Sequence, residues 1–434
     1  MLKLSMATTI PDLLGFLAQL PDLSFKSQTE AWQPDTLNLD AMQQLVADLG
    51  QPQQRYPSLH VAGSNGKGST SALLAAALRA QGYRVGLYTS PHLSGQLAGI
   101  RLDGAPVPLS ELEQSWQTLY PHVARLPQLT LFEVVTALAF QHFARVGVDA
   151  AVIEVGLGGR LDATNVLSPA VVVIMPIDLE HTRVLGDSLA AIAAEKAGII
   201  KAGIPVVMAA QPAEAAAVIR KTAIKQDAPR TEVGQGVLYE RQSWDRQGQQ
   251  LRIWAAERPD EAVNLRLGLL GAHQAANAAG AYAALKAFPL PVSDEAIRAG
   301  YAAARWPGRL QLIEGQPPIL LDAAHTPAAA RALAAADDDH FPDQRWLALI
   351  GVSADKDLDG LLVPLQGRLQ AAWATQSSHP RAMPAYELAR RLQAAGLEAR
   401  AEHRLADAFK AGRELAAAKQ LGLLVFGSVF LVEE

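Results

Sequence analysis

The chain of 434 residues contains no cysteine, and aromatic residues make up only 6% of it. The absence of cysteine excludes disulfide bonds, zinc–thiolate sites and cysteine nucleophiles. Half of the residues are hydrophobic and 19% are charged, a balance that is typical of a folded globular protein and not of a disordered chain. The length predicts two or three domains, because one hydrophobic core rarely extends over so many residues.

The chain also lacks a strong charge and a long apolar run. Its net charge is only −5, so its surface as a whole does not attract nucleic acid or anionic lipid, and an anionic ligand needs a local site. No segment reaches the roughly 18 consecutive apolar residues of a membrane span. The N-terminal segment is interrupted by Pro11 and Asp12 and does not resemble a signal peptide. We expect a cytoplasmic protein that binds neither nucleic acid nor membranes, and we expect it to act as a monomer.

Short apolar segments alternate with alanine-rich helical segments through the first half of the chain. Strands are predicted at 59–63, 84–88, 149–155, 170–175 and 205–209, and helices at 67–81, 130–146 and 189–200. Continuous apolar strands that are separated by helices are typical of a parallel sheet covered on both faces. This part of the chain therefore predicts an α/β domain with a mainly parallel sheet.

The pattern changes twice further along the chain. Polar and apolar residues alternate from about 231 to 266, which predicts antiparallel hairpins at an edge, and a helix is expected at 272–287. After the junction ARWPG, strands are predicted at 319–322, 346–352, 371–375 and 423–426, with helices at 327–335, 385–396 and 406–421. We therefore expect two domains, 1–303 and 304–434, of which the second is a smaller Rossmann-like α/β domain.

The strongest local signal is the sequence HVAGSNGKGST, from His60 to Thr70. A predicted strand ends just before three closely spaced glycines, and a helix opens around Ser69. Glycines allow a tight turn whose N–H groups converge on a phosphate, and the helix N-terminus adds a positive dipole. Lys67 then reaches the β- and γ-phosphates, and the Ser69 hydroxyl reaches Mg²⁺. The alternative is a glycine-rich turn without a ligand. The expected nucleotide-binding residues of this loop are Gly63, Ser64, Asn65, Gly66, Lys67, Gly68, Ser69 and Thr70.

This loop departs from the common pattern G-x-x-x-x-G-K-[ST], because Gly63 and Gly66 are closer together and Gly68 precedes the hydroxyl. In this form it resembles the ATP loop of the Mur ligase superfamily, whose members join a carboxylate to an amine. Together with GLYTSPHL (86–93), it resembles the folylpolyglutamate synthase/dihydrofolate synthase branch. Only 62 residues precede Gly63, fewer than the nucleotide-sugar-binding domain of other branches needs.

The segment IEVGLGGRLDATNV (153–166) places Glu154 at the end of a predicted strand, beside the phosphate loop. A carboxylate there is well placed to bind Mg²⁺, although taken alone it equally fits a carboxylate that is satisfied by Arg160 or by backbone N–H groups. A single histidine or a helix lysine is ordinarily a core or surface residue. The resemblance nevertheless implies that His181 binds metal and that two Mg²⁺ sites exist. It also implies that Lys196 is carbamylated and acts as a carboxylate near the second ion. The expected catalytic residues are Lys67, His181 and Lys196, and the expected metal ligands are Ser69, Glu154 and His181.

Residues of the second half complete the predicted nucleotide site. The resemblance implies that Asn277 in LGAHQAANAAGAY contacts the adenine and that Arg309 in WPGR reaches the phosphates. It further implies that LLDAAHTP places Asp322 at the ribose and His325 near the phosphates. Taken alone, Asn277 fits a helix cap and Asp322 a turn residue at a strand end. Matches at SADKD (353–357), SSHPRA (377–382) and FGSVFLV (426–432) extend the resemblance from about residue 57 to the C-terminus.

The chain departs from the family pattern at several positions near the predicted site. Ala98 and Gly99 stand where the family usually has a Glu-Arg pair, and only the later Arg101 of that pattern is kept. The other replacements are Thr326 for asparagine, Glu180 for aspartate and Asp178 for glycine. The change at Ala98 and Gly99 concerns the acid substrate, and the change at Thr326 concerns the incoming amino acid. The identity of the substrates therefore stays open.

These parts fit one reaction. A carboxylate does not react with an amine at neutral pH until the γ-phosphate of ATP converts it to an acyl phosphate, which the amine then attacks. No protein nucleophile is needed, in agreement with the absence of cysteine and of a GxSxG motif. We expect an ATP-dependent ligase that joins L-glutamate to dihydropteroate, to folates or to both. The alternatives are a Mur-type amide ligase for another carboxylate, a P-loop ATPase, and a homologue that binds nucleotide without ligase chemistry.

Overall fold

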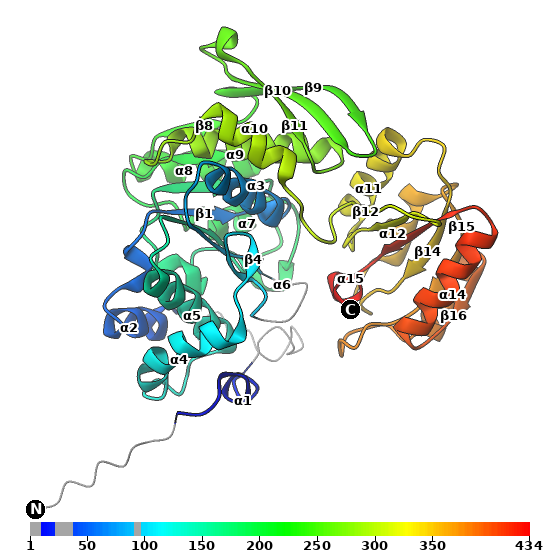
Figure 1. The fold of residues 1–434 in the computed structure, drawn as a ribbon, viewed down its shortest axis with the longest axis horizontal. Coiled ribbons are helices and arrows are strands. Elements are labelled where there is room, and N and C mark those ends of the chain that lie inside the picture. The colour runs from blue at the N-terminus through cyan, green and yellow to red at the C-terminus, as the bar shows by residue number, and fades with distance from the viewer. Residues whose placement is uncertain (1–9, 22–37, 91–96) are drawn as a thin grey trace, which may run out of the picture.

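The structure, a computed structural model, describes residues 10–21, 38–90 and 97–434. Residues 91–93 of the GLYTSPHL motif and residues 1–9 of the N-terminal segment lie outside these ranges. In Figure 1 the blue to green part of the chain forms one large body, and the yellow to red part forms a second, smaller one. Among the described residues, no helix has the length and apolarity that crossing a bilayer requires.

The larger body is built on an eight-stranded sheet with the order β4-β3-β2-β5-β1-β6-β7-β8. The strands from β2 to β8 in this order are parallel, while β3 and β4 add an antiparallel edge. The predicted strands of this half are confirmed to within two residues, and the predicted parallel sheet is confirmed with them. The strand bounds are β1 Ser58–Ala62, β2 Val85–Tyr88, β3 Ile100–Leu102, β4 Ala105–Pro106, β5 Ala150–Glu154, β6 Val171–Ile174, β7 Val206–Met208 and β8 Arg230–Glu232.

Helices cover both faces of this sheet. One of them, α5 (Leu131–Val146), begins at a capping box formed by Thr130 and Glu133, and its C-cap is Gly147 at φ +66°. These signals at the two ends explain why the helix starts and stops where it does. The other helices of this body are α1 Leu13–Leu17, α2 Asp40–Asp48, α3 Lys67–Ala80, α4 Leu109–Val123, α6 Thr182–Leu185, α7 Leu189–Ala197, α8 Ala213–Lys225, α9 Ala272–Ala287 and α10 Asp294–Ala303.

The predicted antiparallel hairpins form a separate sheet and not an edge of the large one, so that part of the prediction is wrong. The strands β9 (Val237–Asp245), β10 (Gly248–Ala255) and β11 (Val263–Leu267) pair in the order β11-β10-β9. Their buried side chains, such as Leu251 and Ile253, join one hydrophobic core with residues of α9. The apolar face of the hairpins therefore covers a helix, which the alternating pattern alone does not reveal.

The smaller body contains a six-stranded sheet with the order β12-β13-β17-β14-β15-β16. All of its pairs are parallel except β12 with β13, which confirms the predicted second α/β domain. The strands are β12 Gln311–Ile313, β13 Ile319–Leu321, β14 Trp346–Ile350, β15 Leu369–Ala374, β16 Ala399–Ala401 and β17 Gly422–Phe426. The helices are α11 Pro327–His340, α12 Leu358–Leu362, α13 Ala385–Ala394, α14 Leu405–Ala418 and α15 Val429–Glu433. We propose the division into domains 1–303 and 304–434, because α10 ends at Ala303 and the next strand belongs to the second sheet.

Candidate functional site

Three neighbouring parallel strands end at the same edge of the large sheet. Glu154, the last residue of β5, pairs in register with Val61 of β1, and Ile174 at the end of β6 pairs with Ala62. The phosphate loop follows β1, and the segment that carries His181 follows β6. Because ligands of open α/β sheets bind outside the carboxyl ends of the strands, this edge is the candidate site.

Three glycines of the loop are needed for close packing. A Cβ added at Gly63 would lie 2.6 Å from the Met175 Cβ, and one at Gly66 would lie 2.5 Å from the Asn277 Oδ1. A Cβ at Gly68 would lie 2.9 Å from the Trp306 indole nitrogen. The loop is therefore pressed between the end of β6, helix α9 and the junction between the domains.

Some residues of the predicted loop bind the loop to the segment that follows β6. The N–H groups of Ser64 and Asn65 both donate to the carbonyl of Pro176, at 2.9 and 3.2 Å. The Thr70 hydroxyl is buried and lies 3.4 Å from the Met175 sulfur. The first turn of α3 begins at Lys67, where N–H groups have no partner within the helix. The N-terminus of α3, whose partial positive charge favours a bound phosphate, is therefore formed by residues 66–69.

We predict that Gly66→Ala raises the dissociation constant for ATP at least tenfold. Gly66 has φ +84°, and the added methyl would collide with the Asn277 amide. Gly203 is a matched control, because its φ is +70° and nothing lies within 4 Å of an added Cβ. Both substitutions carry the strain of a left-handed alanine, about 1–2 kcal/mol in the free energy of unfolding. Isothermal titration with ATP should show weaker binding for Gly66→Ala alone, and equal binding by both variants would contradict the packing argument.

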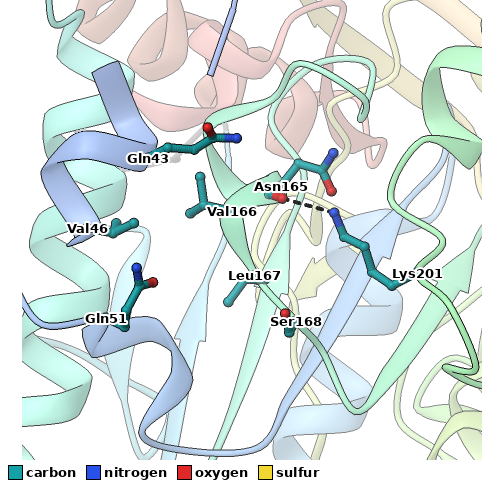
Figure 2. A pocket seen from close by; sticks show the side chains of 8 residues that line it. All are labelled: Gln43, Val46, Gln51, Asn165, Val166, Leu167, Ser168 and Lys201. Carbon is teal, nitrogen blue, oxygen red and sulfur yellow. Dashed lines mark hydrogen bonds between the residues drawn. The ribbon is translucent and has the colours of Figure 1, made fainter. Parts of the chain in front are cut away.

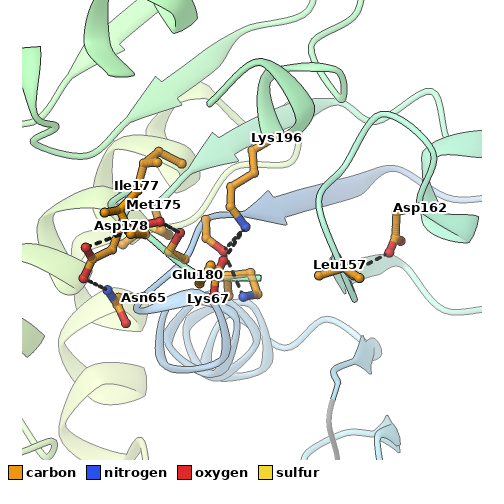
Figure 3. A network of polar contacts seen from close by, with 12 residues as sticks. Asn65, Lys67, Leu157, Asp162, Met175, Ile177, Asp178, Glu180 and Lys196 are labelled. Atoms are coloured by element: carbon orange, nitrogen blue, oxygen red, sulfur yellow. Dashed lines mark hydrogen bonds and ion pairs between the residues drawn. The ribbon is translucent and has the colours of Figure 1, made fainter. Parts of the chain in front are cut away.

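Two lysine side chains converge on one carbonyl of the loop. The Lys67 Nζ and the Lys196 Nζ each donate to the Gly63 oxygen at 2.9 Å. Lys196 is only 2% exposed and also forms an ion pair with Glu180 at 2.7 Å (Figure 3). Burial, followed by the charge of Lys67, lowers the pKa of Lys196 to about 8, although Glu180 opposes this shift. The resulting positive centre lies at the base of the phosphate loop.

An unpaired hydroxyl lies beside the buried carboxylate of Glu154. Glu154 is 4% exposed, and burial raises its pKa to about 7 although the charge of Lys67 opposes the shift. The backbone N–H of Ser90 donates to Glu154, whereas the buried Ser90 Oγ has no hydrogen-bond partner among the described residues. Ser90 was missed by the sequence prediction. The signal that indicates it is its place after β2, which pairs with β5.

The donor set fits Mg²⁺, which prefers oxygen ligands and is commonly held by one or two protein groups together with phosphates. The oxygens of Glu154 and Ser90 provide such groups. The Ser69 hydroxyl is buried and accepts a hydrogen bond from the Gln274 Nε2 at 3.2 Å. His181 is the N-cap residue of the short helix α6, with φ +45°. The described ranges contain no group of three or more His, Asp or Glu side chains that would hold a metal ion by themselves.

Charged residues of the second domain act on groups at this edge of the large sheet. Burial raises the pKa of Asp322, and the charge of Arg309 opposes that shift. Burial raises the pKa of Glu154, and the charges of Lys67 and, to a smaller extent, of Arg309 oppose this shift. Desolvation lowers the pKa of His181, and the charge of Lys356 from the second domain lowers it further.

Three of the predicted nucleotide residues make structural contacts. The Asp322 carboxylate accepts the N–H groups of Leu310 and Ala324, at 2.9 and 2.8 Å. The Asn277 Nδ2 donates to the Gln274 Oε1 at 2.9 Å. The His325 Nδ1 donates to its neighbouring carbonyl at Ala323. These contacts fix the orientation of the three side chains, and they leave the Nε2 of His325 as an acceptor.

One residue that the family pattern keeps, Arg101, and one departure from it, Thr326, have visible structural contacts. The Arg101 guanidinium lies 6.0 Å from the centroid of the Trp306 ring, and its buried Nε has no partner among the described residues. Thr326 caps α11, because its hydroxyl accepts the N–H of Ala329 at 3.2 Å. The threonine therefore has a structural use where the family usually has an asparagine.

Two cavities lie at other places in the larger body. One of about 290 Å³ is lined by residues of α2 and of the segment before β6, with Lys201 at one side (Figure 2). Another of about 270 Å³ lies at the ends of β7 and β8. Neither is lined by a residue that the sequence predicts for the site, so the carboxyl edge of the large sheet remains the candidate.

Comparisons with known proteins show the family to which the chain belongs. The Mur ligase middle domain matches residues 61–285, and the Mur ligase glutamate ligase domain matches residues 308–429. Dihydrofolate synthase/folylpolyglutamate synthase of Bacillus subtilis is 37% identical over 360 residues, which are 81% of this chain and 83% of the relative. The chain belongs to the folylpolyglutamate synthase/dihydrofolate synthase family of Mur ligases.

Solved structures of this family have the same fold. The folylpolyglutamate synthase of Mycobacterium tuberculosis in complex with ADP and AMPPCP is 34% identical, with a TM-score of 0.83 over 92% of this chain and 94% of that one. FolC of Escherichia coli in complex with DHPP and ADP is 32% identical, with a TM-score of 0.83 over 97% of this chain and 95% of that one. Both family members were therefore solved with an adenine nucleotide bound.

Proposed function

We propose that the protein is an ATP-dependent ligase that joins L-glutamate to dihydropteroate, to folate glutamates or to both. The observation that carries this proposal is the convergence of Lys67 and Lys196 on the glycine loop, beside the buried Glu154. The Bacillus subtilis relative is called both a dihydrofolate synthase and a folylpolyglutamate synthase, which supports both acceptors. We further propose that the chain acts as a monomer in the cytoplasm.

The chain's own residues bind and orient the reactants. The backbone N–H groups of residues 66–69 and the Lys67 ammonium hold the triphosphate. Asn277 contacts the adenine, and Asp322 contacts the ribose. Arg309 and His325 approach the phosphates from the second domain. The carboxylate of the acid attacks the γ-phosphorus and ADP leaves, which gives an acyl phosphate. The amine of glutamate then attacks the acyl carbon, phosphate leaves, and the amine loses a proton.

Two Mg²⁺ ions complete this proposal. Glu154, His181 and the hydroxyls of Ser69 and Ser90 provide the ligands of the first ion. Mg²⁺ supplies positive charge that neutralises the phosphate oxygens during transfer. We propose that Lys196 is carbamylated and so provides a carboxylate for the second ion.

The lowered pKa of Lys196 favours carbamylation, because only the neutral amine forms a bond with CO₂ and it then loses a proton. With a pKa of about 8, the neutral fraction rises steeply between pH 7 and pH 9, whereas an unperturbed lysine stays protonated there. Protein equilibrated with ¹³C-bicarbonate should therefore give a carbamate carbonyl signal in ¹³C NMR. We predict that this signal is lost in Lys196→Arg and kept in Lys201→Arg. A signal that survives in Lys196→Arg would contradict the assignment.

The product tests the proposed reaction directly. Mass spectrometry of a mixture of ATP, Mg²⁺, L-glutamate and dihydropteroate should detect an acid that is heavier by one glutamyl residue. A parallel mixture with tetrahydrofolate tests the second acceptor. The absence of both products would contradict the proposed substrates.

A further inference from the structure

The tip of the β9–β10 hairpin lies against the C-terminal end of α11 (Figure 1). The Arg241 Nη1 donates to the Asp339 Oδ2 at 2.8 Å. The Arg246 guanidinium lies 5.5 Å from the centroid of the Phe341 ring. These contacts join the two domains at a place that is separate from the connecting chain at 304–310.

His340, the last residue of α11, lies at the centre of this contact and is only 2% exposed. The backbone N–H of Gly271 lies 2.9 Å from the His340 Nε2, and the Asp245 carbonyl lies 2.7 Å from its Nδ1. An N–H group is always a donor and a carbonyl an acceptor, so Nε2 carries the lone pair and Nδ1 carries the proton. Burial lowers the pKa of His340, which favours this neutral form. One ring therefore bridges two segments of the first domain from a helix of the second.

Gly271 is the residue from which α9 begins, and it is held on both sides. Its N–H donates to His340, and its carbonyl accepts the Gln249 Nε2 at 2.9 Å. The first turn of α9 carries Gln274, whose amide donates to the Ser69 hydroxyl at 3.2 Å. The next turn carries Asn277, which contacts the loop at Gly66. The position of Gly271 therefore sets the position of side chains that reach the phosphate loop.

The other end of α11 reaches the second half of the site. This helix of 14 residues begins at Pro327, directly after His325 and Thr326. It spans roughly 20 Å, because each residue of an α-helix adds about 1.5 Å. A rotation of the second domain that moves His325 would also move His340 away from Gly271.

We propose that His340 is a positioning residue that holds the second domain against the start of α9 and so keeps the two halves of the nucleotide site in one geometry. This inference rests on the proposed function for the identity of the ligand, whereas the contact between the domains does not depend on it. A histidine that only fills the core would change the stability of the protein and leave the domain orientation and the KM for ATP unchanged.

Three substitutions of His340 distinguish the effects of its two hydrogen bonds, at Nε2 and at Nδ1. His340→Gln keeps an acceptor near the place of Nε2, His340→Asn keeps a donor near the place of Nδ1, and His340→Ala keeps neither. We expect His340→Ala and His340→Asn to raise the KM for ATP at least fivefold, with kcat lowered at least tenfold. We expect His340→Gln to stay within twofold of the wild type. His403→Ala, at an exposed histidine of the same domain, is the matched control and should change neither constant.

The domain orientation gives a readout that does not require turnover. Because the chain has no cysteine, spin labels can be placed on Lys221→Cys in α8 and Lys410→Cys in α14, which are both exposed positions. Double electron–electron resonance should show a broader distance distribution in His340→Ala than in the wild type or in His340→Gln. An unchanged distribution in His340→Ala, or recovery by His340→Asn and not by His340→Gln, would overturn the inference. If the wild type has no glutamate-dependent activity, the proposed function fails, and the distance distribution still decides the role of His340.

Discussion

Lys67→Ala is expected to lower kcat by at least about 1,000-fold, because in the proposed reaction it removes a positive charge that stabilises the transferring phosphate. Lys67 is half-buried in the first turn of α3, and its ammonium contacts the protein through the Gly63 carbonyl. The loop geometry depends on glycine packing and on the bonds of Ser64 and Asn65 to Pro176. The substitution should therefore leave the fold intact.

The control for Lys67→Ala is Lys410→Ala, at an exposed position on α14. Both variants should have the same thermal unfolding midpoint as the wild type to within a few degrees. Steady-state kinetics should show a loss of turnover for Lys67→Ala alone. If Lys67→Ala kept near wild-type activity, the phosphate loop would be wrongly assigned.

Glu154→Gln is expected to have an effect of similar size and to leave stability unchanged or increase it. The Glu154 carboxylate is 4% exposed, and a buried charge costs folding free energy unless a partner compensates it. A neutral amide of the same shape avoids this cost, but it is a poorer ligand for Mg²⁺ than a carboxylate. A residue whose removal stabilises the fold while abolishing activity is typical of a functional site.

The two effects of Glu154→Gln are separable by experiment. Activity should fall at least about 1,000-fold at any Mg²⁺ concentration, while the unfolding midpoint in the absence of nucleotide stays the same or rises. Glu414→Gln, at an exposed position of α14, should change neither quantity. Wild-type activity in Glu154→Gln would remove this carboxylate from the metal site, and a large drop in the unfolding midpoint would indicate a structural role.

Much of the fold follows from local patterns in the sequence. The apolar strands of the large sheet and the helices α3, α5 and α9 lie within a few residues of their predicted positions, because periodicity and capping are local properties. The location of the β9–β10 hairpin was not predictable in this way. Alternation of polar and apolar residues indicates that a strand has one buried face, and it does not say which element covers that face.

The site was predictable where a motif is continuous and not where contacts join distant segments. The loop from Gly63 to Thr70 and the strand end at Glu154 follow from a local motif. Ser90 acquires its place beside Glu154 only through the pairing of β2 with β5. His340 lies 69 residues from Gly271 in the sequence, and no local pattern indicates their contact. Asp322 was expected at the ribose, and its bonds to the junction of the domains are visible only in the structure.

The most direct test is phosphate release by the purified wild-type protein with ATP and Mg²⁺, measured with and without L-glutamate and dihydropteroate. The account predicts rapid release only when both substrates are present, because the acyl phosphate forms on the acid and is consumed by the amine. Equal release in the absence of the acid and glutamate would indicate an ATPase and would contradict the ligase. The absence of release with every acceptor tested would contradict catalysis at the phosphate loop.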